Sequence, residues 1–140
     1  MGLITLYEKW SKIYFIDLAE QTLLEMDEFI AELNRKQMYD KGVRADGSEI
    51  TPEYSGLTEF FKRQKGQIVN HVTLKDSGDF HKSIFADIYS SDLVLDATDK
   101  KTNSLLEKYG EVLGLTEESL MILQNEFRPR YVKNIEKALQ

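Results

Sequence analysis

The sequence begins with a long stretch that contains no helix-breaking residue. From Leu3 to Tyr39 the chain has neither proline nor glycine, the two residues least compatible with a helix interior. Apolar residues recur there at steps of three and four, which is the period of one helix face. We therefore expect residues 1–39 to form one long helix, bent near Asp17. Its expected buried stripe is Ile16, Ala19, Leu23, Met26, Ile30 and Leu33.

The first turns of this stretch are apolar on more than one side. Around the aromatic residues Tyr7, Trp10 and Tyr14, further apolar residues spread over more than one side of a helix. The full set is Leu6, Tyr7, Trp10, Ile13, Tyr14 and Phe15. Such a segment either folds back on the chain's own sheet or contacts another subunit. Tryptophan and tyrosine are favoured at protein interfaces. Both alternatives stay open, and Tyr7, Trp10 and Tyr14 are candidate subunit-contact residues.

Residues 40–68 are expected to form a turn-rich connector. The pair Asp46-Gly47 is typical of a short hairpin, because both residues tolerate the backbone of a tight turn. Ser55 or Thr58 is expected to cap a short helix within the connector, since a hydroxyl can accept a hydrogen bond from a free N–H at a helix start.

Residues 69–98 are expected to hold the β-structure. We predict two strands, Phe80–Tyr89 and Leu93–Ala97, joined by a turn that includes Ser90 and Ser91. A two-stranded sheet by itself is only marginally stable in water. The pair must therefore pack on a helix or a third strand.

Residues 99–140 are expected to contain a short helix, a loop and a long final helix. Gly110 and Gly114 bracket the loop, which looks mobile from its sequence. A flexible segment can order on a neighbour, so Val112 and Leu113 are also candidate subunit-contact residues. Thr116 is expected to cap the final helix, with two glutamates in its first turn.

The chain has 140 residues, which suits a single domain spanning 1–140 with one core. The net charge of −6 argues against a general nucleic-acid binder, which carries a basic face. The basic stretch Lys62–Lys65 is expected to be a solvated connector.

No cysteine is present, which excludes disulfides and thiolate metal sites. No apolar run approaches the roughly 20 residues that span a bilayer. The sequence predicts a soluble α+β fold, with long N-terminal and C-terminal helices packed on a small antiparallel sheet.

Motifs of catalysis are absent from the sequence. It contains no phosphate-cradling glycine loop, nucleophile elbow or metalloprotease helix. Asp76, Asp79, Asp96 and Asp99 are the candidate ligands of a divalent metal in a hydrolase. Aspartates near strand ends are more often turn formers. We therefore expect no catalytic residues, no cofactor and no metal, and the metal-dependent hydrolase is kept as an alternative.

A short signature lies in the middle of the chain, between Leu74 and Ser83. It resembles the signature of the virion morphogenesis and tail-completion proteins of tailed bacteriophages, in which leucine, aspartate, threonine or serine, and glycine precede a strand. Three earlier segments also resemble that family in their order along the chain: the pair Asp46-Gly47, the segment Thr51–Ser55 and the basic stretch Lys62–Gly66. The signature positions are filled by Leu74, Asp76, Ser77, Gly78, Phe80 and Ser83, and the later aromatic-glycine pair by Tyr109 and Gly110.

The resemblance implies a structural role without catalytic residues. It implies a ring of identical copies at the head–tail neck or the tail terminus, in contact with other phage neck, tail or connector proteins. Such a protein resides in the virion, passes through the host cytoplasm during assembly and has no membrane partner. It encloses DNA without binding it specifically, which suits an acidic chain. A small adaptor module unrelated to phages is the alternative of a different class.

Overall fold

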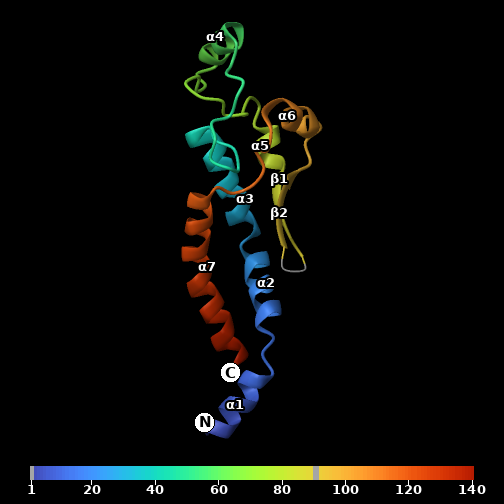
Figure 1. Ribbon diagram of the computed structural model, residues 1–140, viewed down its shortest axis with the longest axis vertical. Helices are drawn as coiled ribbons and strands as arrows, with labels where there is room; N and C mark the ends of the chain where they lie inside the picture. Colours follow the sequence, from blue (N-terminus) through green and yellow to red (C-terminus); the bar gives the residue numbers. More distant parts are fainter. Residues whose placement is uncertain (1, 90–91) are drawn as a thin grey trace.

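Three helices run along the molecule, and a two-stranded sheet lies against them. The computed structural model describes residues 2–89 and 92–140. Helices α2 (Phe15–Glu25) and α3 (Asp27–Lys36) follow one another, and α7 (Glu117–Ala138) returns beside them (Figure 1). The architecture is α+β, as the sequence predicts.

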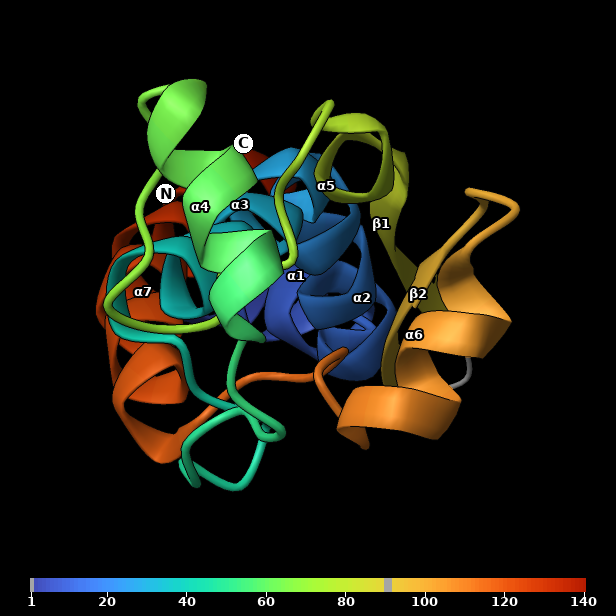
Figure 2. The same ribbon diagram turned by 90° about the horizontal axis from the view of Figure 1, so that it is seen from above.

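The sheet consists of strands β1 (Ile84–Tyr89) and β2 (Asp92–Ala97), which pair in antiparallel fashion along their full length. Ser90 and Ser91, where a turn is expected, lie outside the described residues. One face of the sheet packs on α3 and α2. In the view along the long axis, α2 and α3 lie between α7 and the sheet (Figure 2).

Two clusters of buried apolar side chains hold these layers together. One cluster joins α2, α3, the sheet and α7 through Met26, Ile30, Ile88 and Leu123. The other collects side chains from segments that are far apart in the sequence, beside the second half of α3. Its largest contributors are Met38, Ile50, Val72, Leu74, Phe80, Ile84, Tyr109 and Val112.

The expectation of one helix from Leu3 to Tyr39 is wrong. The chain instead forms α1 (Leu3–Ser11), α2, α3 and a π-helical turn, η1 (Gln37–Lys41). Tyr14 has an extended backbone and Met26 a non-helical one. Neither break contains glycine or proline, but Met26 is almost fully buried in the core. Packing therefore overrides the local helix preference at this position.

Helix α1 lies at one end of the molecule, away from the sheet (Figure 1). Of its nine described residues, none is buried. Lys9 Nζ donates to the carbonyl of Leu139 over 3.1 Å, and the rings of Trp10 and Phe15 lie 5.5 Å apart. The first helix thus touches the chain's C-terminal end and does not pack on the sheet.

The expectation of a strand from Phe80 to Tyr89 is wrong in its first half. Residues Asp79–Ser83 form a short helix, α5, and β1 begins only at Ile84. Gly78, with φ of +92°, turns the chain into this helix. Phe80 and Ile84 are both buried. Their spacing of four fits a helical turn as well as a strand, so the pattern is ambiguous.

The capping predictions at Ser55 and Thr116 are confirmed. Helix α4 (Gly56–Gln64) starts after Ser55, whose hydroxyl accepts a backbone N–H at 3.2 Å. Thr116 caps α7 in the same way at 3.1 Å. A bridge between Val43 and Glu49 closes the expected aspartate-glycine turn.

The expectation of a mobile loop at 110–114 is wrong. After α6 (Thr102–Tyr109), the side chain of Val112 is fully buried. Asn34 of α3 donates to the carbonyl of Val112 and accepts the N–H of Gly114, both at 2.9 Å. Val112 is therefore a core residue and not a surface for a neighbouring subunit, and the adjacent Leu113 is half-buried against the core.

We expect Asn34→Ala to lower the free energy of unfolding by about 1–3 kcal/mol, because it leaves a buried carbonyl and a backbone N–H without partners. Urea unfolding followed by circular dichroism measures this. The control is Asn125→Ala, an exposed position on α7, which is expected to change stability by less than about 0.5 kcal/mol. Equal losses in the two variants would contradict the prediction.

Candidate functional site

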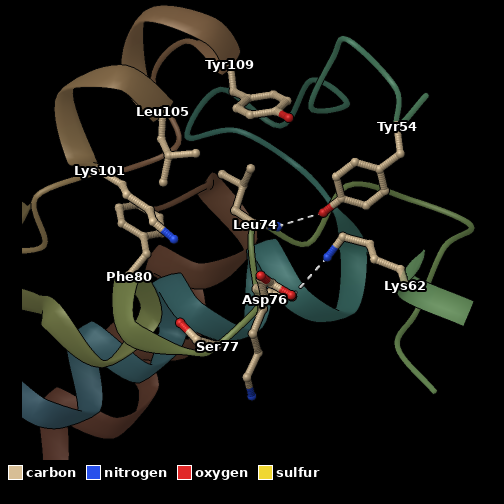
Figure 3. Close-up of a pocket in the computed structure, with 10 residues that line it drawn as sticks. Tyr54, Lys62, Leu74, Asp76, Ser77, Phe80, Lys101, Leu105 and Tyr109 are labelled. Carbon is tan, nitrogen blue, oxygen red and sulfur yellow. Dashed lines mark hydrogen bonds between the residues drawn. The ribbon is translucent and has the colours of Figure 1, made fainter. Parts of the chain in front are cut away.

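The signature segment forms one wall of a surface pocket of about 160 Å³ (Figure 3). The opposite walls come from α4, the segment before it, and α6. The structure therefore brings most signature residues together with Tyr109, which is more than 25 positions later in the sequence. The pocket is lined by Tyr54, Lys62, Leu74, Lys75, Asp76, Ser77, Phe80, Lys101, Leu105 and Tyr109.

Ser77, Gly78 and Ser83 of the signature determine the path of the backbone into and out of α5. The Ser77 hydroxyl accepts the N–H of Asp79 at 3.3 Å, and Gly78 adopts a left-handed backbone. The Ser83 hydroxyl donates to a carbonyl of α5 at 2.9 Å and accepts the N–H of Asp99 at 3.0 Å. These contacts start α5 and fasten its end to the segment after β2.

Lys62 is buried, contrary to the expectation of a solvated connector. Its Nζ donates to the carbonyl of Lys75 at 3.1 Å and to the side-chain oxygen of Gln67 at 3.2 Å, and it lies 4.7 Å from the centre of the Tyr54 ring. The Tyr54 hydroxyl in turn accepts the N–H of Leu74 at 3.2 Å. Tyr54 and Lys62 thus join α4 to the signature.

The four aspartates considered as metal ligands have separate environments. Asp76 pairs with Lys65 at 2.9 Å, and this hydrogen bond lowers the pKa of the Asp76 carboxyl. The Asp96 carboxylate accepts the backbone N–H of Ala97 at the end of β2, and the Asp99 carboxylate accepts the N–H of Lys101 in the turn before α6. Asp79 lies in the first turn of α5. Within residues 2–89 and 92–140, no group of three or more potential ligands could hold a metal ion.

His81, which falls within the predicted strand Phe80–Tyr89, is instead a buried residue of α5. Its Nε2 lies 2.8 Å from the carbonyl oxygen of Thr73. Burial lowers the pKa of the imidazole, and the nearby charges of Lys75 and Arg35 lower it further. His81 therefore stays neutral at pH 7.

Arg35 of α3 holds the junction between α5 and β1. Its guanidinium donates to the carbonyls of His81 at 2.7 Å and Ile84 at 2.9 Å. It also pairs with Glu28 and Glu32 on its own helix. This one side chain therefore ties the signature and the start of the sheet to the central helices.

The candidate contact residues of the N-terminal segment lie at the end of the molecule far from α4 (Figure 1). Tyr7 is 73% exposed and Tyr14 is 76% exposed, whereas Trp10 is partly covered by Phe15. We define the α1 surface as Leu3, Ile4 and Tyr7 of α1 together with Tyr14, which directly precedes α2; all four are more than 70% exposed.

A second apolar surface, which the sequence pattern does not single out, lies at the opposite end of the molecule. We call it the α4 surface, formed by Leu57, Phe60 and Phe61, each more than half exposed. The rings of Phe60 and Phe61 contact each other edge to face. The two ends therefore carry unlike apolar side chains on unlike helices.

Comparison with models of protein families, with curated proteins and with solved structures finds no match to this chain. Among the described residues, no helix is both long enough and apolar enough to cross a membrane. The function is therefore inferred from the chain's own residues and their geometry.

We expect Gly78→Ala to destabilise the fold by about 1–2 kcal/mol, because a residue with a Cβ is strained in the left-handed conformation. A Cβ there would meet no atom closer than 3.8 Å, so the loss reports backbone strain and not a clash. Gly56→Ala at the start of α4, where φ is not positive and space is open, is the control and should not destabilise. Thermal unfolding of the two variants beside the wild type tests this, and equal melting temperatures would refute it.

We expect His81 to make the fold sensitive to mild acid. Its pKa is lower in the folded protein than the ordinary value of 6.5, so below pH 6.5 the unfolded chain binds more protons than the folded one. Stability is then lost as the pH falls below 6.5. His81→Gln, which can still donate to the Thr73 carbonyl, should show a shallower loss. Urea unfolding at pH 7.5 and 5.5 compares the two, and parallel losses would exclude this role.

Proposed function

We propose that this protein is a structural subunit of the neck or tail terminus of a tailed bacteriophage, and that it assembles with copies of itself into a ring. Its further partners are other neck, tail or connector proteins. It acts in the virion after assembly in the host cytoplasm. The resemblance of the segment from Leu74 to Ser83 first suggests this function.

The observation that carries the proposal is the pair of unlike apolar surfaces at opposite ends of an elongated molecule. Large exposed apolar patches on soluble proteins mark interaction sites. Ring assembly requires heterologous contacts, in which two different surfaces of each copy meet. The α1 surface and the α4 surface meet that requirement, because they differ in residues and lie on separate helices.

The contacts of the signature also support a structural role. Its hydroxyls and its carboxylate Asp76 are engaged with neighbouring groups of the same chain. Among the described residues, no buried side-chain nitrogen or oxygen lacks a hydrogen-bond partner. The signature thus fixes the path of the chain between α4, α5 and the sheet, which a subunit of defined shape needs.

The test is the assembly state of the purified chain with and without the α1 surface. We expect wild-type protein to form rings, seen by light scattering after gel filtration and by electron microscopy. Tyr7→Ser with Tyr14→Ser should weaken assembly about 100-fold, because each aromatic side chain contributes at least roughly 1.5 kcal/mol when buried. The monomer should keep its helical circular dichroism, since both side chains are exposed.

Met121→Ser is the matched control, because Met121 is an exposed apolar residue on α7, 64% accessible to solvent. It should leave the rings intact. Wild-type protein that stays monomeric at high concentration would overturn the proposal. A monomer that binds a protein unrelated to phage particles would favour the adaptor alternative, and thermal stabilisation by a divalent metal would favour the hydrolase.

A further inference from the structure

The face of the sheet that points away from the helices alternates apolar and acidic side chains. Each apolar residue on one strand lies opposite an aspartate on the other. All six side chains are exposed. The segment from 84 to 97 contains no lysine, arginine or histidine, so its charge is −3. The cross-strand pairs are Phe85 with Asp96, Asp87 with Val94, and Tyr89 with Asp92.

This acidic face forms no ion pair in the described part of the chain, since no ion pair there includes Asp87, Asp92 or Asp96. Its aromatic side chains are substantially open to solvent, with Phe85 39% and Tyr89 52% exposed. A sheet face that only contacts water is better served by polar side chains than by exposed aromatic ones. The face therefore suits a partner that offers positive charge beside apolar surface.

A basic hollow of about 630 Å³ lies between α3 and α5. Four cationic side chains and two carboxylates line it, which leaves a charge of +2. Arg35 is paired with both carboxylates, Glu28 and Glu32. The three lysines carry the remaining positive charge, and in the described part of the chain none of them is in an ion pair. They are Lys36, Lys75 and Lys82.

We propose that the acidic face of one copy docks in the basic hollow of the next copy. This contact rests on the proposed ring and names the charged surfaces that orient it. Three aspartates face three lysines, and an ammonium group can also lie over the ring of Phe85 or Tyr89. Tyr39 lines the hollow, with Lys75 Nζ 4.9 Å from its ring centre, so aromatic surface is present on both sides.

The two surfaces are arranged for a head-to-tail contact. They belong to different elements of the same copy, so each copy can use its acidic face on one neighbour and its hollow on another. Two acidic faces repel each other, which disfavours a closed dimer through that face. A DNA backbone fits the hollow less well, because its continuous negative charge would meet Glu28 and Glu32 and it offers no aromatic side chains.

Paired charge reversals test the contact. Lys75→Glu with Lys82→Glu makes the hollow acidic, and Asp87→Lys with Asp96→Lys makes the sheet face basic. Each double variant alone then presents like charges at the contact. We expect each to assemble roughly tenfold more weakly or worse than wild type in sedimentation at physiological salt. Mixing them in equal amounts should restore assembly, because each variant's sheet face again meets a hollow of opposite charge.

The control for the charge change is Arg128→Glu with Lys133→Glu, two exposed positions on α7, which should assemble like wild type. Monomeric wild type would refute the proposed ring itself. Wild-type rings that tolerate both reversals, or reversals that mixing does not rescue, would refute this contact while the ring stands. Binding of duplex DNA that Lys75→Glu with Lys82→Glu abolishes, with assembly unchanged, would assign the hollow to nucleic acid and overturn the inference.

Discussion

The hydrogen bonds from Arg35 to the carbonyls of His81 and Ile84 fix the position of α5 and of the sheet relative to the central helix α3. They join the end of the signature to α3, and they fix where β1 starts. A guanidinium whose side chain is mostly buried is costly unless it is paired. Glu28 and Glu32 supply that pairing. The position of the sheet therefore depends on a charged side chain as well as on the apolar core.

Arg35 also lines the basic hollow between α3 and α5. Arg35 pairs with the two glutamates of the hollow, whereas the three lysines beside them form no ion pair in the described part of the chain. Arg35 also helps to hold the pKa of His81 low, after burial. A neutral His81 can stay inside the fold against the Thr73 carbonyl. The short helix α5 thus separates a basic hollow from an acidic sheet face at a fixed geometry, as a repeated contact requires.

Apart from the α+β class with its small antiparallel sheet, the features that the sequence predicts correctly are local ones. The caps at Ser55 and Thr116 depend on a hydroxyl and a few following residues, so local chemistry suffices. The break at Met26 depends on packing against α7 and the sheet, which no local pattern contains. The sequence does not reveal the helical start of the segment Phe80–Tyr89, because the spacing of four between Phe80 and Ile84 fits the period of a helix as well as that of a strand. The burial of Lys62 follows from oxygens that only the tertiary fold brings near it.

The apolar ends and the charged sides of the molecule have complementary consequences for assembly. The hydrophobic effect is not directional. Apolar surfaces such as the α1 surface would therefore by themselves also allow two copies to associate through the same end. Charged surfaces add little affinity but strongly disfavour the wrong pairing. In the proposed contact, an acidic face that repels its own copy and docks in the hollow of another would therefore select head-to-tail order. Both charged surfaces of the proposed contact adjoin α5, so in the proposed ring the angle between successive copies would depend on the backbone that Ser77, Gly78 and Ser83 shape.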